Sequence, residues 1–388
     1  MHEIILKKNH SKRIKASHLW VFSNEIEHVP ENVSDGDMVC VKTHDNRIAG
    51  YGFYNRSSLI SCRLLDKTFE GDLRKYTEEK IRRAEEFRNH IYPYRNSYRL
   101  VFAESDFLPG LIIDKYNNTY VMQVNSAGIE KNVDIVVSVL RDRFDAVNIF
   151  TKNDFYLRKL EGLDESDRIY LGERAEEIIS DGHVSYHINF NQSQKTGFYF
   201  DQHDNRLYIH KISRGMSVLD GYCNSGSFGI HSLIAGAAKV TFVDSSEKEI
   251  NNVKENLRLN NITAESELIV SDMFIYLEQC ISSGKKFDLI LLDPPSFAPS
   301  KRNVPSALKG YTKLAYLALR CVTAKGYLIM SSCSHHISQG DFLESVKKAS
   351  LKCNLNIRLV HFSGASADHP VLLSMPETKY LKFAVFSV

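Results

Sequence analysis

The feature that most constrains the fold is a series of five short apolar strands after Gly215, each followed by polar residues. These strands alternate with segments of helical pattern, and the alternation predicts a parallel, doubly wound α/β sheet. The carboxyl ends of parallel strands meet at one edge of such a sheet, where open sheets bind their ligands. The residues at these ends therefore predict one shared binding site: Asp220, Asp244, Asp272, Asp293 and Cys333.

The first two strand ends favour a nucleotide-like ligand. Gly226 and Gly229 would let the backbone approach a ligand closely at the turn after the first strand. The sequence has neither the GxGxxG signature of dinucleotide-binding folds nor a P-loop. Asp244 stands at the end of the second strand, where a carboxylate can bind two ribose hydroxyls. The structural alternatives are a glycine turn without a ligand and, for Asp272, a helix N-cap.

The segment from Asp293 through Pro294, Pro295 and Ser296 to Phe297 predicts a rigid turn that holds a planar base. Two consecutive prolines restrict the backbone of the turn. The flanking carboxylate and ring can then grip a base by a hydrogen bond and by stacking. The alternative is a rigid strand-to-helix connection without a ligand.

Two further segments precede the sheet. Short strands separated by turn residues predict a β-barrel-like module over residues 1–70. The next segment, residues 71–190, predicts an α+β domain. Its expected elements are a charged helix over 72–91, strands over 98–104, 110–116 and 119–125, and a helix over 129–144.

Composition excludes several classes of protein. The formal net charge is only +2, so any surface that binds nucleic acid must be local. The 7 cysteines are widely spread and lack CxxC pairs, which argues against a disulfide framework or a zinc site and fits a reducing cytosol. No apolar run approaches the roughly 18 residues of a membrane span, and the basic N-terminus lacks the apolar stretch of a signal peptide. We therefore expect a cytoplasmic protein with no metal and no membrane partner.

Together these motifs resemble those of class I S-adenosylmethionine-dependent methyltransferases. More narrowly, the chain resembles the bacterial large-subunit (23S) rRNA cytosine-C5 methyltransferases that carry an N-terminal PUA domain. The resemblance covers the whole chain and is carried by KKNHSKRIKASHLWVFSNEI, QKTGFYFDQHDNR, DPPSFAPSK, SSCSHH and SADHPV. It implies a PUA domain over 1–70, a central α+β domain over 71–190, and a Rossmann-like methyltransferase domain with a seven-stranded, mostly parallel sheet over 191–388.

The resemblance also implies S-adenosyl-L-methionine as cofactor and large-subunit rRNA as partner. The expected cofactor site combines strand ends, the loops after them and the segment before the sheet: Asp220, Tyr222, Asn224, Ser225, Gly226, Asp244, Ser245, Asp272, Met273, Asp293, Lys195 and Gln202. The expected RNA contacts are Pro294, Pro295 and Phe297 at the target base and Lys12, Arg13 and Trp20 in the N-terminal module. A solvated basic face is the alternative for this module. The oligomeric state stays open, with a homodimer as one alternative.

Cytosine carbon 5 is too weakly nucleophilic to take a methyl group directly, so a thiolate must first add at carbon 6. The position after the fifth strand, together with the resemblance, makes Cys333 the expected nucleophile. A buried structural thiol is its alternative. Asp293 is expected to bind the cytosine edge. Many RNA cytosine-5 methyltransferases carry a second cysteine after Pro-Pro, where this chain has Ser296.

Two other functions are compatible with these motifs. The Asp-Pro-Pro-Ser-Phe segment also resembles the motif of exocyclic amino methyltransferases, which need no thiol, so their reaction would survive Cys333→Ala. A non-catalytic RNA-binding or assembly factor would explain the N-terminal module alone, and measured methyl transfer would exclude it. No motif specifies the target nucleotide, or whether free rRNA or an assembled subunit is the substrate.

Overall fold

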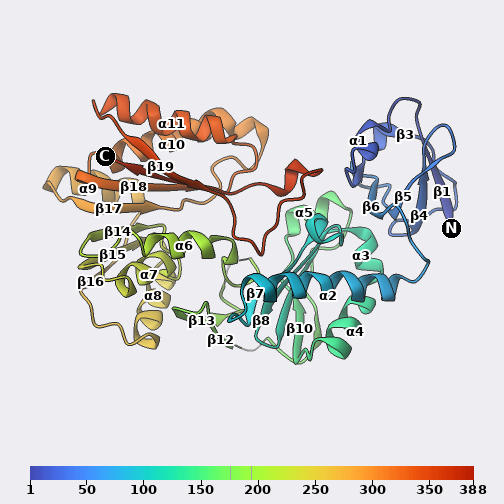
Figure 1. The fold of residues 1–388 in the computed structure, drawn as a ribbon, viewed down its shortest axis with the longest axis horizontal. Helices are drawn as coiled ribbons and strands as arrows, with labels where there is room; N and C mark the ends of the chain where they lie inside the picture. The colour runs from blue at the N-terminus through green and yellow to red at the C-terminus, as the bar shows by residue number, and fades with distance from the viewer. Residues whose placement is uncertain (175, 194) are drawn as a thin grey trace. The chain divides into compact units, whose positions relative to one another are not determined.

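The computed structural model describes residues 1–174, 176–193 and 195–388 (Figure 1). The chain forms two compact units. Unit 1 comprises residues 1–179, 188–200 and 367–378, and unit 2 comprises residues 180–187, 201–366 and 379–388. The expected boundary near residue 70 thus lies inside unit 1, and a segment close to the C-terminus returns to that unit. The division into three domains stays a prediction.

The N-terminal part of unit 1 is a six-stranded sheet in the order β2-β6-β5-β4-β1-β3. Apolar side chains from these strands form its core, and Met375, from the returning C-terminal segment, is fully buried in it. The expected strands in this part correspond to β1, β4, β5 and β6. The elements are β1 (His2–Leu6), α1 (Lys12–Lys15), β2 (Trp20–Val21), β3 (Ile26–His28), β4 (Met38–Lys42), β5 (Ile48–Tyr54) and β6 (Cys62–Asp66).

The second part of unit 1 is a five-stranded sheet in the order β11-β10-β9-β8-β7, with α2 packed against α4 and β7. The helix expected over 129–144 is wrong as one helix, because it is interrupted at Asn132. The Asn132 side chain donates to the Gly128 carbonyl (2.8 Å) and so competes with the helical backbone for that acceptor. The elements are α2 (Leu73–Ile91), β7 (Ser97–Phe102), β8 (Leu111–Tyr116), β9 (Thr119–Val124), α3 (Ala127–Lys131), α4 (Val133–Arg143), β10 (Asn148–Thr151), α5 (Phe155–Leu160) and β11 (Ile169–Leu171).

Buried ion pairs join the two parts of unit 1. Arg63 of β6 donates to Glu104 (3.1 Å) and to Glu161 (2.7 Å), and its side chain is only 12% exposed. Glu161 also accepts from Ser58 (2.8 Å) and from Asn55 (2.9 Å). Because a buried charge that loses its partner is costly, this cluster fixes the N-terminal sheet to the second part of the unit.

Unit 2 contains the seven-stranded sheet that the resemblance implies, in the order β16-β15-β14-β17-β18-β20-β19. Strands β14 to β18 are parallel, and β20 runs antiparallel between β18 and β19. Helices α6, α7 and α8 pack on one face and α9, α10 and α11 on the other (Figure 1). The expected mostly parallel, doubly wound architecture is therefore confirmed.

The elements of unit 2 follow the alternation read from the sequence. They are α6 (His203–Ile209), β14 (Ser217–Gly221), α7 (Ser227–Ile234), β15 (Lys239–Asp244), α8 (Glu247–Leu259), β16 (Ser266–Val270), α9 (Met273–Ser283), β17 (Phe287–Leu292), α10 (Val304–Leu319), β18 (Val322–Ser332), α11 (Gln339–Lys352), β19 (Arg358–Ser363) and β20 (Lys382–Ser387). A hairpin of β12 (Glu176–Ser180) and β13 (Ser185–Asn189) supplies residues to both units.

We predict that Glu161→Ala destabilises unit 1 by about 3 kcal/mol, because it leaves the buried Arg63 with one carboxylate fewer. Trp20, the single tryptophan of the chain, belongs to unit 1. Its fluorescence during urea unfolding therefore reports this unit, and the midpoint should fall. Glu70→Ala is the matched control, since the Lys75–Glu70 pair is mostly exposed (68% and 83%) and its loss should leave the midpoint unchanged. An equal response of the two variants would contradict the assigned role of the cluster.

Candidate functional site

Three carboxylates gather at the carboxyl edge of the unit 2 sheet, where the strand order reverses between β14 and β17. Asp220 is fully buried, and its pKa is raised well above the usual range by burial and by the negative charges of Asp293 and Asp244. Its Oδ2 accepts from the Gly229 amide (2.7 Å), whereas its buried Oδ1 has no hydrogen-bond partner among the described residues. A buried acceptor without a partner is rare and marks a place where a ligand can donate.

The turn after β14 is shaped by three residues with left-handed backbone: Tyr222 (φ 60), Asn224 (φ 47) and Gly226 (φ 76). This turn presents the Asn224 amide to Oδ2 of Asp244 (3.0 Å), while Oδ1 of Asp244 accepts from the Ser246 amide (3.0 Å). Each carboxylate oxygen can accept a second hydrogen bond. Asp244 can therefore still bind two neighbouring hydroxyl groups.

Gly229 has a structural explanation that the sequence analysis missed. A Cβ at this position would lie 2.2 Å from the Phe242 ring, so α7 can pack on β15 only without a side chain there. Packing of α7 on β15 therefore explains a glycine at this position, and close approach of Gly229 to a ligand stays a prediction.

The residues after the second and third strand ends are only partly available to a ligand. Asp272 caps α9, since its Oδ1 accepts from the Phe274 (2.9 Å) and Ile275 (3.1 Å) amides, and this confirms the N-cap alternative. Its charge also raises the pKa of Tyr222, after the larger effect of burial. Met273 is 2% exposed and belongs to the core. Among the remaining predicted loop residues, Ser245 is exposed and Ser225 is half-buried.

Gln202 lies against Asp293, a contact that the sequence analysis did not predict. Its Nε2 donates to Oδ2 of Asp293 (3.0 Å), and its Oε1 accepts from Asn205 (2.7 Å). The spacing of three residues places Gln202 and Asn205 on one side of a helical turn and accounts for the bond between them, but it does not indicate Asp293. Gln202 thus orients the Asp293 carboxylate.

Lys195, also in the segment before the sheet, adds nothing to the Gln202–Asp293 contact. Lys195 belongs to unit 1, where its Nζ lies 5.4 Å from the centre of the Tyr199 ring. Its role at the cofactor stays a prediction. Gln194, at the start of the segment, lies outside the described residues.

The turn that carries Cys333 is bonded to the turn that contains Pro294 and Pro295. The Ser334 hydroxyl lies 3.0 Å from the Ser296 hydroxyl and 3.4 Å from the Ala298 amide. On the other side of Cys333, the Ser332 hydroxyl accepts from Tyr311 (2.9 Å). The structure thus brings the predicted nucleophile and the predicted base-binding turn together.

The same contacts fix the aromatic side of the turn. The Phe297 ring lies 4.8 Å from the Tyr311 ring, centre to centre, and is half-buried. Pro295 is exposed and Pro294 is buried, so the turn presents one proline to solvent. The stacking of a base on Phe297 and Pro295 stays a prediction.

The other cysteines are in different surroundings. In the described part of the chain, which includes all seven cysteines, none forms a disulfide. Burial raises the pKa of Cys223 well above the usual range, and the charges of Asp220 and Asp244 raise it further. Burial is also the largest cause of a raised pKa for Cys40, Cys62, Cys280, Cys321 and Cys353. Cys333 and Cys353 are half-buried and the other five cysteines are buried, and of the two only Cys333 directly follows β18 at the carboxyl edge of the sheet, a position that suits a reactive thiol.

The described residues lack two kinds of feature. They contain no group of three or more His, Cys, Asp or Glu side chains that could hold a metal ion. They also contain no helix whose length and apolar character would let it cross a membrane.

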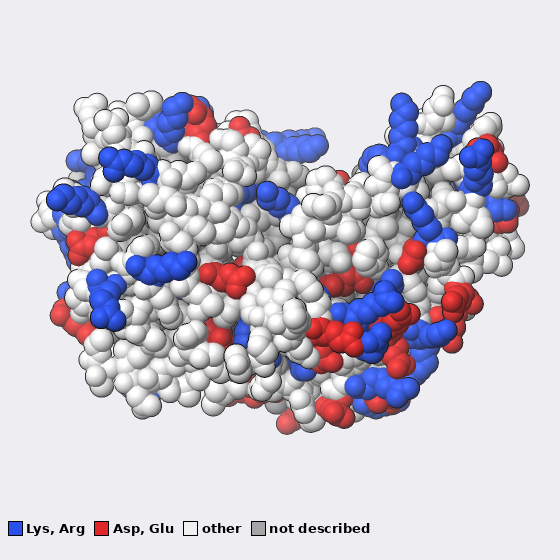
Figure 2. All heavy atoms as spheres, viewed as in Figure 1, with Lys and Arg blue, Asp and Glu red and all other residues white. Residues whose placement is uncertain are grey.

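The predicted RNA contacts of the N-terminal module differ in availability. Lys and Arg side chains gather over this module near α1 (Figure 2), and Lys12 is exposed there. Arg13 is 43% exposed, pairs with Glu25 (2.9 Å) and lies over the Phe22 ring.

Trp20 lies at the junction of the two parts of unit 1. Its indole N–H donates to Glu104 (2.8 Å), and the Arg63 guanidinium lies 5.5 Å from its ring centre. This geometry makes Trp20 part of the junction and leaves its expected role in base stacking without support.

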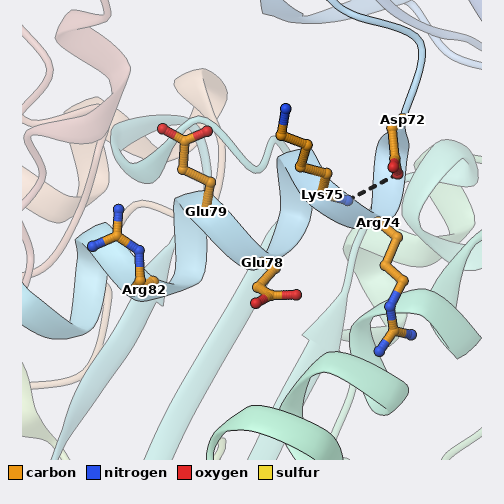
Figure 3. Close-up of a pocket in the computed structure, with 6 residues that line it drawn as sticks. All are labelled: Asp72, Arg74, Lys75, Glu78, Glu79 and Arg82. Carbon is orange, nitrogen blue, oxygen red and sulfur yellow. Dashed lines mark hydrogen bonds between the residues drawn. The ribbon is translucent and has the colours of Figure 1, made fainter.

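A surface hollow on α2 is lined entirely by charged side chains of both signs: Asp72, Arg74, Lys75, Glu78, Glu79 and Arg82 (Figure 3). Most of them form ion pairs along the surface, for example Arg74 with Asp142 (2.8 Å) and Glu78 with Arg143 (3.0 Å). No apolar residue lines the hollow, and its charged side chains indicate a solvated face.

Family models match two parts of the chain. Residues 4–67 match a PUA-like domain. Residues 200–350, which contain most of the sheet and its site, match a family described as conserved hypothetical protein 95.

Solved structures match the fold over the full length. A proposed methyltransferase complexed with SAH superimposes with a TM-score of 0.86 at 19% identity and covers 100% of both chains. A proposed SAM-dependent methyltransferase from Streptococcus mutans gives a TM-score of 0.85, also at 19% identity and with 100% coverage of both chains. At this identity the likeness shows a shared fold.

Curated relatives match along almost the whole sequence. Ribosomal RNA large subunit methyltransferase I of Aeromonas hydrophila is 35% identical over 387 residues, which cover 98% of this chain and 97% of the relative. The protein of the same name from Pseudoalteromonas atlantica is 33% identical, with 99% of both chains covered. With this identity over nearly the full length of both chains, the protein belongs to the ribosomal RNA large subunit methyltransferase I family.

Proposed function

We propose that this protein transfers the methyl group of S-adenosylmethionine to large-subunit rRNA and forms 5-methylcytosine through a covalent adduct of Cys333. The observation that carries the proposal is the bonding of the Cys333 turn to the Asp-Pro-Pro turn through Ser334 and Ser296. Membership of the family and the PUA-like domain support rRNA as the substrate. The cytoplasmic location follows from this substrate as part of the proposal.

The strand-end carboxylates suit S-adenosylmethionine, which supplies an electrophilic methyl group when it is bound. Asp244 retains acceptor capacity for the two ribose hydroxyls. The unpartnered Oδ1 of Asp220 can accept from a cationic or N–H group of the cofactor. The structural neighbour complexed with SAH shares the fold that brings these strand ends together.

In the proposed reaction, the Cys333 thiolate forms a bond to cytosine carbon 6, and the displaced electron pair makes carbon 5 nucleophilic. Asp293, oriented by Gln202, accepts a hydrogen bond from the cytosine amino group, and protonation of the ring nitrogen offsets the negative charge that arrives from the thiolate. Carbon 5 then takes the methyl group as the bond between that group and the cofactor sulfur breaks, which leaves S-adenosylhomocysteine. Loss of the carbon-5 proton to a base breaks the carbon–sulfur bond and regenerates the thiolate.

Asp244→Ala should weaken S-adenosylmethionine binding by about 1–3 kcal/mol, as expected when hydrogen bonds to a charged group are lost. Isothermal titration calorimetry in a buffer with chelator measures the effect. Glu265→Ala is the matched control, because Glu265 is 69% exposed and precedes β16 at the opposite edge of the sheet. Equal weakening by both variants, or no binding by the parent protein in chelator, would contradict this site.

Cys333 should form a trapped adduct with RNA that contains 5-fluorocytosine, because the fluorine at carbon 5 cannot leave as a proton does. The adduct should need S-adenosylmethionine and should survive denaturing gels. Cys333→Ser should lose the adduct and still bind the cofactor, whose predicted contacts lie mainly on other strand ends. Cys223→Ser is the control and should keep the adduct. Methylation at nearly the parental rate in Cys333→Ala would contradict Cys333 as the nucleophile and would favour methylation of an exocyclic amino group instead.

Lys12→Gln should weaken RNA binding and lower the slope of log K against log salt by about 1 if Lys12 contacts a phosphate. The measurement is binding to deproteinised large-subunit rRNA at several salt concentrations. Lys347→Gln, at an exposed position on α11, is the control for loss of one positive charge and should leave the slope unchanged. An unchanged slope in Lys12→Gln would assign this part of the module to a solvated face.

A further inference from the structure

Lys382 is a buried lysine beside the proposed nucleophile. It is the first residue of β20, and the antiparallel register pairs it with Ser332, the residue before Cys333. Only 6% of Lys382 is exposed, and the strand continues with the buried residues Phe383, Ala384 and Val385. An ammonium group at the head of an apolar strand needs a partner in the fold.

The ammonium group of Lys382 holds the turn that follows Cys333. Its Nζ donates to the Ser334 carbonyl (2.6 Å) and to the Ile337 carbonyl (2.9 Å). These two carbonyls lie one and four residues after Cys333, so both ends of the turn are hydrogen-bonded to the same ammonium group. The same Ser334 also connects this turn to Ser296 through its hydroxyl.

The charge of Lys382 lacks a carboxylate partner among the described residues. The groups that act on it are the Cys333 thiol and the exposed Lys379. Burial lowers the pKa of Lys382 to about 8, and Cys333 acts in the opposite direction. The group therefore carries its charge at pH 7, and the interaction with Cys333 is reciprocal: a thiolate that favours the ammonium form is itself favoured by it.

Other titratable groups border this pair. Tyr311, whose pKa is raised mainly by burial, senses the charges of both Cys333 and Asp293. His335 stacks on Tyr380 with the ring centres 5.2 Å apart. A carboxylate near Cys333 would disfavour its thiolate, and the buried ammonium group of Lys382 acts in the opposite direction.

We propose that Lys382 is the positioning residue of the nucleophile: it fixes the Cys333 turn through two carbonyls and stabilises the Cys333 thiolate. The use of that thiolate in methyl transfer rests on the proposed function. The stabilisation itself is a property of the folded protein and can be measured without RNA or cofactor.

The test is the pH dependence of alkylation by iodoacetamide, followed for each cysteine by peptide mass spectrometry on the full chain. In the parent protein the Cys333 midpoint should lie below about 8.5, the usual value of a free thiol. Lys382→Met should move the midpoint upward and slow alkylation at pH 7 by about threefold or more. Lys382→Arg, which keeps the charge, should restore most of the rate. Cys353, which is also half-buried, is the internal control and should not change.

Lys379→Met is the matched control for loss of a nearby positive charge, because Lys379 is exposed and makes no bond to the turn. It should leave the Cys333 midpoint almost unchanged. An equal shift in Lys379→Met and Lys382→Met, or an unchanged profile in Lys382→Met, would overturn the proposal.

If Lys382→Met fails to fold, the parent protein alone still tests the proposal. A midpoint of Cys333 alkylation at or above about pH 8.5 would contradict stabilisation of the Cys333 thiolate. A low midpoint together with no trapped RNA adduct would sink the covalent function and leave the pairing of Lys382 with Cys333 intact. The two proposals can therefore fail separately.

Discussion

The parallel alignment of β14 to β18 is the constraint on which the candidate site depends. It brings Asp220, Asp244 and Asp293 to one edge although they are far apart in the sequence, and burial, together with the charges of Asp293 and Asp244, raises the pKa of Asp220. Gathering like charges at a buried position opposes folding, and the Gly229 amide offsets only part of that cost. A sheet that keeps a buried carboxyl oxygen without a partner is therefore prepared for a ligand that donates hydrogen bonds or carries positive charge.

The antiparallel strand β20 has a specific consequence for the same edge. In a parallel sheet only the last residues of a strand reach the carboxyl edge, whereas an antiparallel strand brings its first residue there. Lys382 therefore arrives beside the end of β18, where Cys333 begins its turn. One reversed strand places a cation at an edge that the parallel strands supply with acids, and the proposed thiolate lies next to that cation.

Local pattern was enough to predict the five parallel strands, the strand-end acids and the meeting of Cys333 with the Pro-Pro turn, because each depends on strand period and strand direction. The contacts between side chains from distant segments could not be read in this way. Nothing near Gln202 indicates Asp293, and nothing near Ser334 indicates Ser296. The helix break at Asn132 and the packing of Gly229 were not predicted for a related reason. The first depends on which acceptor the Asn132 side chain reaches, and the second on which ring a neighbouring strand presents.

The SADHPV segment shows how a recognisable motif can serve the fold. Asp368 is completely buried in unit 1, where it accepts from the Arg99 amide (3.2 Å) and pairs with His369 (2.8 Å). Its carbonyl accepts from Arg88 (2.9 Å), whose guanidinium also pairs with Asp106. These bonds hold the returning segment 367–378 in unit 1, and Met375 of that segment is buried in the N-terminal core. Removal of residues 1–70 would expose Met375 and leave Glu104 and Glu161 without Arg63, so point substitutions test RNA contact without dismantling the unit that presents it.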